Sequence, residues 1–434
     1  MKFGAIKEEL VFSVENGAPV YRVKLPVWGE FLFKFTGRWT FFCLCLMALL
    51  VPFNVVFLKW AAVSGFGMLC ARKIIEAGIG KKPLWRGNPL NGAVGTFVIA
   101  MGASTIFSEN MYDSSQIFSE RIIPYAIIFL MAKETITTRK RLFGFLGVMG
   151  LVAFVVGFDA VWQYFTGRDL FFGYSMDSNY DVGGVAITGP FGRHSFLSGY
   201  LEMVVPLFVF CSFFTRPWYA RALIFATTIL LIFSWMYVFQ RGMVLSVTIS
   251  LFAVLFLYKK RYSYMFLSII LAAFFLLPSL MHKRIVDTFQ PGGDNGRFQL
   301  WQQALELFVR NPLTGTGLGG YERYSNSLGL PDIHVHSTYF ELLAEAGIVG
   351  LGAFLFLIFV FFRHQAGAFK NLCRDYRQRI TCAGFTALCV SSLISGLFTT
   401  NIVVGIACSA MFWMSLAVAT GIPYIPLSED QRFS

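Results

Sequence analysis

Two histidines, His334 and His336, lie one residue apart just before a long hydrophobic segment that begins near residue 338. An unperturbed imidazole has a pKa near 6.5, so either ring can act as a general base at neutral pH. A metal site is a weaker interpretation, because His-x-His points both rings the same way only on a strand and no Cys or carboxylate nearby completes a ligand set. The plainer alternative is that these side chains cap the helix that follows.

Arg241 stands in a three-residue connection, Gln240-Arg241-Gly242, between two long apolar segments. A charged side chain at membrane depth costs about 2.5–3.5 kcal/mol on insertion scales, so it usually has a partner or a function. A guanidinium can donate two parallel hydrogen bonds, which suits a diphosphate. Arg193 and Arg297 are further candidates for the same site. The alternative for each arginine is a side chain that snorkels to the membrane surface.

A glycine-rich run at residues 315–320 follows Asn311-Pro312-Leu313 and precedes Tyr321. Backbone N–H groups in such a run can bind phosphate, but the run lacks the Lys and the strand-to-helix context of a P-loop. Gly317 and Tyr321 are therefore predicted only as supporting residues of a site.

The elements that must position these residues are membrane-spanning helices. The chain has 434 residues, of which 56% are hydrophobic and 14% charged, whereas soluble proteins have about 25% charged residues. We predict an all-α polytopic membrane protein with about twelve transmembrane helices. The hydrophobic segments lie at about residues 39–53, 55–71, 89–107, 117–132, 142–165, 194–214, 220–239, 242–258, 263–281, 338–362, 380–398 and 402–420.

Lys and Arg residues give the predicted orientation. Most of them fall before the first segment and in alternate connections, and cytoplasmic connections are enriched in these residues. Both termini are then cytoplasmic, with residues 1–38 as an N-terminal segment, 39–420 as the transmembrane domain and 421–434 as a tail. The large outer connections are residues 166–193 and 282–337, the second between the ninth and tenth helices. This topology accounts for the net charge of +12 without a nucleic-acid partner.

Smaller features complete the plan. Asn16-Gly17 between two β-prone runs predicts a hairpin between Phe12 and Val23. The eight cysteines include no CxxC pair, so neither a disulfide framework nor a metal site is indicated.

The larger outer connection contains one predicted helix, over residues 298–310. Asp294 or Asn295 can cap its start, and Asn311-Pro312 ends it. We expect this helix to lie on the outer membrane surface through an apolar face. The residues predicted on that face are Leu300, Ala304, Leu307 and Phe308.

Several of these motifs resemble one known family. His336-Ser337, followed after nine residues by Gly347-Ile348-Val349-Gly350-Leu351, resembles the histidine-containing signature of the O-antigen ligase family. Gln240-Arg241-Gly242 resembles the Ser-Arg-Gly turn of that family, with Gln in place of Ser. Residues 296–301, 311–313 and 315–319 resemble its outer loop. The twelve-helix plan is similar too.

The resemblance implies a GT-C-like membrane glycosyltransferase in the bacterial inner membrane, with its active site on the periplasmic face. The donor would be a glycan on undecaprenyl diphosphate, and the acceptor a lipid A core sugar or another glycan. Membrane lipids would surround the protein, and the resemblance implies no metal and no other cofactor.

The resemblance also implies residue roles in a single inverting displacement. Arg241 and Arg297 would bind the diphosphate, with Arg193 as a supporting contact. His336 would take the proton from the acceptor hydroxyl, and His334 would be its neighbour.

Two alternatives stay open. Leu351-Gly352 replaces the Thr-rich sequence common in ligases, which favours an O-antigen or exopolysaccharide polymerase of the same family. A twelve-helix transporter or flippase belongs to a different class, and it would use acidic residues within the spans. The acidic residues in or near the spans are Asp159, Glu202, Glu341 and Glu345.

Overall fold

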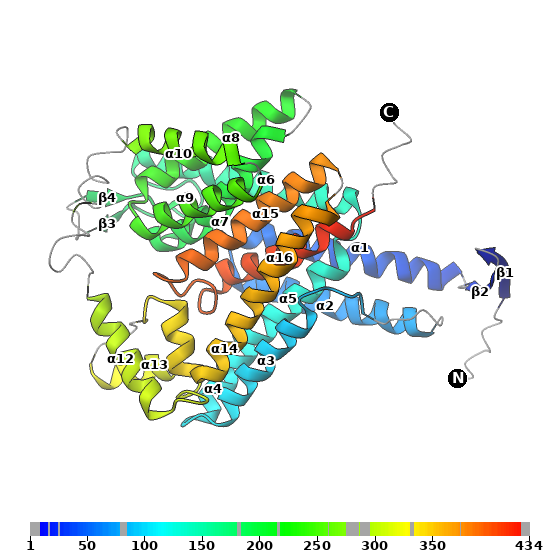
Figure 1. Cartoon of the computed structure of the whole chain (residues 1–434), viewed down its shortest axis with the longest axis horizontal. Helices are drawn as coiled ribbons and strands as arrows, with labels where there is room; N and C mark the ends of the chain where they lie inside the picture. Colours follow the sequence, from blue (N-terminus) through cyan, green and yellow to red (C-terminus); the bar gives the residue numbers. More distant parts are fainter. Residues whose placement is uncertain are drawn as a thin grey trace.

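The computed structural model is almost entirely helical (Figure 1). It describes residues 9–15, 18–24, 27–78, 85–179, 184–214, 218–258, 260–274, 286, 296–329, 334–373 and 375–426. The fold class predicted from composition, an all-α membrane protein, is confirmed.

The N-terminal hairpin is present. Strands β1 (Glu9–Glu15) and β2 (Ala18–Lys24) pair antiparallel, and Glu15 lies opposite Ala18. This register leaves two residues for the turn, which is what the Asn16-Gly17 pair predicts. Figure 1 shows the hairpin at the far end of α1, away from the other helices.

Each of the twelve predicted hydrophobic segments overlaps a helix, and residues 275–281 of the ninth segment lie outside the described residues. The first helix begins at Val27, inside the segment predicted as a cytoplasmic extension, and the predicted turn at Pro52-Phe53-Asn54 separates it from the second. The helices are α1 (Val27–Leu50), α2 (Val55–Gly78), α3 (Asn91–Ile106), α4 (Met111–Ile117), α5 (Ile123–Thr135), α6 (Arg139–Thr166), α7 (His194–Phe214), α8 (Trp218–Tyr237), α9 (Arg241–Tyr258), α10 (Lys260–Phe274), α12 (Arg297–Arg310), α13 (Gly320–Ser327), α14 (Thr338–Gly367), α15 (Tyr376–Ser395) and α16 (Ile406–Gly421).

Seven helices in the described ranges are long and apolar enough to cross a membrane, and α3 and α9 are shorter apolar helices. The expected total of twelve spans stays a prediction. The fourth predicted segment is the most irregular, because α4 and α5 are joined by a π-helical turn, η1 (Phe118–Ile122). Glu120 and Arg121, which interrupt the apolar sequence, lie in this turn.

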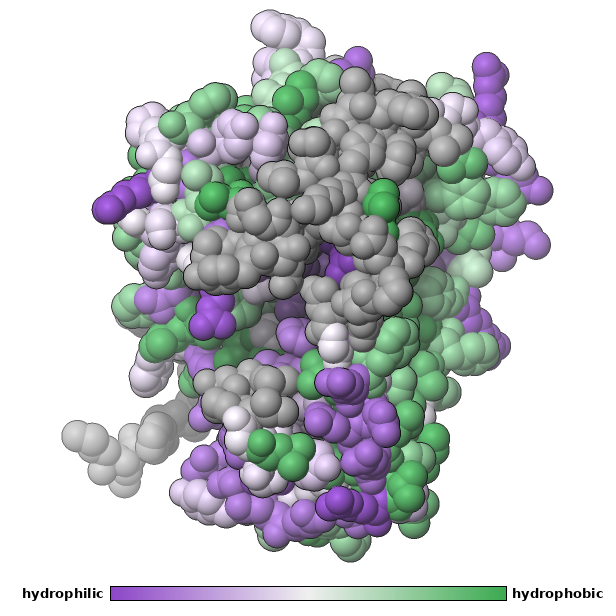
Figure 2. All heavy atoms as spheres, turned by 90° about the vertical axis from the view of Figure 1, so that its left-hand side faces the viewer, coloured by the Kyte–Doolittle hydropathy of each residue, from purple (hydrophilic) through white to green (hydrophobic). Residues whose placement is uncertain are grey.

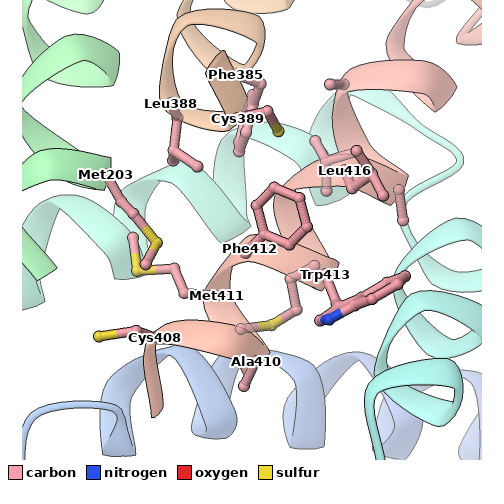
Figure 3. Packing of buried hydrophobic residues seen from close by; sticks show 14 of the residues in the cluster. Met203, Phe385, Leu388, Cys389, Cys408, Ala410, Met411, Phe412, Trp413 and Leu416 are labelled. Carbon is pink, nitrogen blue, oxygen red and sulfur yellow. The ribbon is translucent and has the colours of Figure 1, made fainter. Parts of the chain in front are cut away.

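The centre of the core is α16. Figure 3 shows Met411, Phe412 and Trp413 of this helix among side chains of α15 and α7. The Trp413 ring also stacks on Tyr125 of α5, at 6.0 Å between centroids, and lies 5.6 Å from the ring of Phe97 of α3. Residues from Cys408 to Thr420 are buried, so α16 is enclosed by neighbouring helices.

Helix α14 is broken at Gly347, which has φ 61° and ψ −163°. The break leaves backbone groups of α14 without helical partners, and the loop of residues 312–317 supplies them. Thr316 N–H and Gly317 N–H donate to the carbonyls of Ala344 and Glu345, at 3.0 and 2.9 Å. In return, the carbonyls of Pro312 and Leu313 accept from Ile348 and Val349 N–H, at 2.9 and 3.2 Å. The loop of residues 312–317 is thus fastened directly to the helix that follows His336.

Replacing Gly347 with alanine is expected to destabilise the protein strongly. A side chain in this backbone region costs about 1–3 kcal/mol, and its Cβ would lie 2.4 Å from the Leu313 carbonyl oxygen. Thermal unfolding of the purified protein in detergent measures the effect. The matched control is Gly352→Ala on the same helix, where a Cβ would meet nothing within 4 Å. Equal melting temperatures for the two variants would contradict this account of the break.

Candidate functional site

A small apolar cluster fixes the loop that carries the two histidines. Five side chains are buried together: Ala304 and Leu307 of α12, Tyr321 of α13, Val335 in the loop before α14, and Ala344 of α14. At its edge, the ring of Trp301 on α12 stacks on Phe340 on α14, with 5.1 Å between centroids and 17° between planes. Because Val335 lies inside this cluster, the positions of His334 and His336 on either side of it are set by packing.

His336 has a left-handed backbone, with φ 52°. Such a conformation is uncommon for a residue other than glycine, and it often accompanies a functional constraint. The next residue, Ser337, caps α14 by accepting from Phe340 N–H, at 3.5 Å. Thr338 N–H then donates to the carbonyls of Gly396 and Thr399, at 2.8 and 2.9 Å. His336 therefore lies just before α14, beside the connection between α15 and α16.

The surroundings of His336 keep its imidazole neutral. Dense protein around the ring, followed by the charges of Arg297 and His334, lowers the pKa of His336 to about 4. The residue as a whole still has an exposed surface, so a substrate can reach it. Arg297 is the first residue of α12, after Gly296 with φ 73°. The structure thus brings together three of the predicted site residues, His336, His334 and Arg297.

Arg241 is the first residue of α9 and follows a strained turn. Phe239 in that turn has φ 55°, a rare value for a bulky side chain, and is buried against Ala186. The hydroxyl of Ser198 on α7 donates to the Gln240 side chain at 3.3 Å. This contact holds the start of α9 against α7 and leaves Arg241 half-buried.

The connection between α15 and α16 joins the Arg241 region to the His336 region. A Cβ on Gly242 would lie 3.3 Å from Cβ of Phe398, so α9 begins directly against this connection. Two residues of the same connection, Gly396 and Thr399, accept the hydrogen bonds from Thr338 at the start of α14. Sequence reasoning missed this connection, although Thr399, Thr400 and Asn401 make it polar between two apolar segments.

Arg193 lies at the start of α7 and is exposed. Its carbonyl accepts from Phe196 and Leu197 N–H, at 3.2 and 3.3 Å, which is the backbone role of a residue that begins a helix. Its place in the site depends on its neighbour His194 and on the contact between Ser198 of α7 and Gln240.

The candidate residues share one structural position, the N-terminus of a helix. Arg193 immediately precedes α7, Arg241 and Arg297 begin α9 and α12, and His336 lies two residues before α14. Helix N-termini carry partial positive charge and unpaired N–H groups, which favour anions. Each of these helix starts therefore pairs a candidate residue with N–H groups that can bind an anion such as a diphosphate.

The glycine-rich run has a different role from the one predicted. The N–H groups of Thr316 and Gly317 are used by α14, and Tyr321 N–H donates to the carboxylate of Glu345 at 3.3 Å. The anion at the start of α13 is thus a side chain of the protein itself. The N–H group of Gly317 is therefore not available to a phosphate, and the role of Gly317 as a supporting residue stays a prediction.

Tyr321 also has a packing role. It is almost fully buried, and its hydroxyl donates to the Gln303 side chain at 3.0 Å. Burial, followed by the charge of Glu341, raises the pKa of Tyr321 to about 12, so the phenol stays protonated. Its contribution to the site is to hold α13 against α12.

Helix α12 ends at Arg310, before Asn311-Pro312 as predicted, and it begins after Gly296. Asp294 and Asn295, the predicted caps, lie outside the described residues. The predicted membrane face is wrong in part, because Ala304 and Leu307 are buried against α13 and α14. The exposed apolar side chains of this helix are Phe298, Leu305 and Val309.

Sequence reasoning also missed a hydrogen-bonded pair near Arg193. Nδ1 of His194, the first residue of α7, lies 2.6 Å from Oδ2 of Asp177 on β3 (Asp177–Asn179). Asp177 and His194 are 17 residues apart, and no sequence pattern indicated that they meet. The hairpin of β3 with β4 (Gly184–Ala186) brings them together. Within the described ranges, no group of three or more His, Cys, Asp and Glu residues is placed to hold a metal ion.

Figure 2 shows the side of the molecule where Figure 1 places β3, β4, α12 and α13. Hydrophilic side chains gather on the lower part of this face, over α12 and α13, whereas hydrophobic side chains cover much of the surface elsewhere. This polar face coincides with the part of the fold that holds Arg297 and the two loop histidines.

Comparison with known proteins agrees with the motifs. Residues 198–355 match the family model described as O-antigen ligase, a range that contains Arg241, Arg297 and His336. No curated protein matches the sequence. The range runs from α7 into α14, whereas Arg193 and the α15–α16 connection lie outside it. Over this part of the chain, the protein is similar to the O-antigen ligase family.

Proposed function

We propose that this protein transfers a glycan from an undecaprenyl diphosphate carrier to an acceptor sugar on the periplasmic face of the bacterial inner membrane, with both termini in the cytoplasm. The observation that carries the proposal is the neutral imidazole of His336 beside Arg297, in a domain that matches the O-antigen ligase family. The start of α9, which carries Arg241, lies against Phe398 in the α15–α16 connection, and that connection also contacts the start of α14; this supports placing Arg241 in the same site.

The proposed chemistry is one inverting displacement. Nε2 or Nδ1 of His336 takes the proton from the acceptor hydroxyl as its oxygen attacks C1 of the donor sugar. The bond between C1 and the diphosphate oxygen breaks, and the electron pair leaves with the diphosphate. Arg241 and Arg297 stabilise the negative charge that develops there, as preorganised donors do in other transferases.

Because Arg297 lowers the pKa of His336, the donor is expected to bind before the acceptor. A pKa of about 4 makes His336 a weak base in the free protein. When the donor diphosphate neutralises Arg297, one of the charges that lowers this pKa is compensated, so the basicity of His336 rises. Donor binding therefore prepares the base for the acceptor.

This mechanism predicts the pH dependence of transfer. A lowered pKa favours the neutral imidazole, so the acid limb of kcat/KM, which reports the free protein, is expected near pH 4 in the wild type instead of near 6.5. In Arg297→Gln, the loss of the positive charge raises the pKa of His336 and moves this limb toward higher pH. Profiles of kcat/KM between pH 4 and 8 measure the shift. A limb that stays in place, or moves to lower pH, contradicts the assigned interaction.

The ligase and the polymerase forms of the proposal differ in their products. In a strain that lacks the gene, long carrier-linked chains that do not reach their acceptor indicate a ligase. Single repeat units on the carrier or acceptor indicate a polymerase. Gels and mass spectrometry of the lipid-linked and surface glycans distinguish the two, with wild type and His336→Asn as complementing genes. Unchanged glycan pools contradict both forms.

The structure gives little support to transport as the alternative. Asp159 accepts from Leu170 N–H at 2.7 Å, and Glu345 accepts from Tyr321 N–H at 3.3 Å. Two of the four acidic residues near the spans thus hold outer loops in place. We therefore favour transfer on the outer face.

A further inference from the structure

We propose that Asp177, His194 and Tyr174 form a subsite for the sugar of the donor that is attached directly to the diphosphate. This inference rests on the proposed function and deepens it, because it assigns residues to the recognition of the first sugar.

The Asp177–His194 pair leaves one nitrogen of the imidazole for a ligand. Oδ2 of Asp177 and Nδ1 of His194 are 2.6 Å apart, and their side chains are 35% and 24% exposed. An ionised carboxylate only accepts hydrogen bonds, so Nδ1 carries the proton and Nε2 is directed elsewhere. Nε2 accepts a hydrogen bond when the ring is neutral and donates one when it is charged. A sugar hydroxyl, which can do either, is a suitable partner in both states.

The pair lies next to the residues proposed to bind the diphosphate. Arg193 immediately precedes His194 in the sequence. Asp177 lies opposite Ala186 in the β3–β4 pair, and Ala186 packs against Phe239, two residues before Arg241.

A second connection runs along α7. Ser198, one helical turn beyond His194, donates to Gln240 at 3.3 Å. The first sugar of the donor is covalently attached to the diphosphate, so a polar pair between Arg193 and the Arg241 turn is placed to contact that sugar.

Tyr174 provides an aromatic surface at the same place. A Cβ on Gly192 would lie 3.1–3.3 Å from three atoms of the Tyr174 ring, so the ring covers the turn that leads to His194. Tyr174 is nevertheless 43% exposed. An exposed ring beside a few fixed polar groups is a common lining of small-molecule sites.

Buried polar side chains hold Tyr174 and this turn together. Gln163 on α6 is fully buried, and its Nε2 donates to the Tyr174 carbonyl at 3.0 Å and to the Thr188 hydroxyl at 2.9 Å. Its Oε1 accepts from Thr188 N–H and Gly189 N–H, both at 2.8 Å. The Asp169 side chain accepts from Tyr174 N–H as well. Four hydrogen bonds to one buried amide make the subsite preorganised, as a recognition site requires.

The test separates recognition of the sugar from recognition of the diphosphate. The protein is purified in proteoliposomes, and the KM for the lipid-linked glycan of its host is compared with the inhibition constant of undecaprenyl diphosphate, which has no sugar. His194→Ala is expected to raise the donor KM roughly 3- to 10-fold, the effect of one hydrogen bond, with kcat and the inhibition constant little changed. Asp177→Asn should act in the same direction, and His194→Gln, which keeps a hydrogen-bonding side chain, should restore part of the affinity.

Controls distinguish the possible failures. His364→Ala removes a histidine from the last turn of α14 and should leave all constants unchanged. Equal increases in KM and in the inhibition constant for His194→Ala would overturn the subsite, because the residue would then serve the diphosphate or the fold. An unchanged KM in both His194→Ala and Tyr174→Ala would overturn it too, and Tyr174 would be a membrane-interface residue. If the wild type transfers nothing from the donor, the proposed function itself fails and the subsite fails with it.

Discussion

Replacing His336 with asparagine is expected to lower kcat for glycan transfer by a factor of at least about 100, which is the usual contribution of a general base. The physical reason is that His336 is the neutral imidazole beside Arg297 and lies two residues before the start of α14. The donor KM should change little, because the asparagine variant keeps both arginines. Initial rates with saturating donor and acceptor in proteoliposomes give kcat directly.

Asparagine is the sharper substitution because of the backbone at this position. His336 has φ 52°, a conformation that asparagine adopts more readily than alanine does. His336→Ala therefore combines the loss of the base with backbone strain, whereas His336→Asn isolates the chemistry. Melting temperatures should differ little between the wild type and His336→Asn.

His334→Ala is the matched control, since it removes the neighbouring imidazole and keeps the base. We expect a modest effect, because His334 contributes one of the charges that lower the pKa of His336. If His336→Asn folds and keeps more than a tenth of the wild-type kcat, His336 is not the base. If His334→Ala loses more activity than His336→Asn, the two roles are reversed.

The helices were the most predictable part of the fold. The segment predicted at residues 194–214 has the same bounds as α7, since an apolar run flanked by polar residues marks where a helix leaves the membrane. The start of α1 was predicted too late, because Glu30, Lys34 and Arg38 lie among the aromatic residues of its first turns and lower the local hydropathy. The hairpin was predictable from its two-residue turn alone.

The candidate site was predictable as residue types but not as geometry. His336, Arg297 and Arg241 were identified from local sequence, since each is a polar residue at the end of an apolar or amphipathic segment. The glycine-rich run was misread because its hydrogen bonds go to α14, about 30 residues away, and no local pattern reports them. The Asp177–His194 pair was missed for the same reason.

The second large effect is expected at Arg241. Arg241→Lys keeps the positive charge but loses the planar fork, so a bidentate interaction with the diphosphate becomes a single one. Losing one hydrogen bond to a charged group costs about 1.5–3 kcal/mol, which corresponds to a decrease in kcat/KM of roughly 10- to 100-fold. Because Arg241 is the first residue of α9, its side chain and the helix N-terminus act on the same anion.

The inhibition constant of undecaprenyl diphosphate provides the independent readout. It should rise in Arg241→Lys together with the donor KM, unlike in His194→Ala, because Arg241 is assigned to the diphosphate and not to the sugar. In Arg241→Gln the inhibition constant should rise further, since the positive charge is lost as well. Arg261→Lys, an exposed arginine at the start of α10, is the matched control and should behave like the wild type.

The outcome at Arg241 decides between a ligand site and a membrane-surface side chain. A snorkelling arginine is replaced by lysine at little cost, because both side chains carry a charge on a flexible apolar stem. Replacing a ligand-binding arginine with lysine is costly, because only the guanidinium has donors spaced to match two phosphate oxygens. Full activity in Arg241→Lys would thus remove Arg241 from the site and leave the strained turn at Phe239 without a functional explanation.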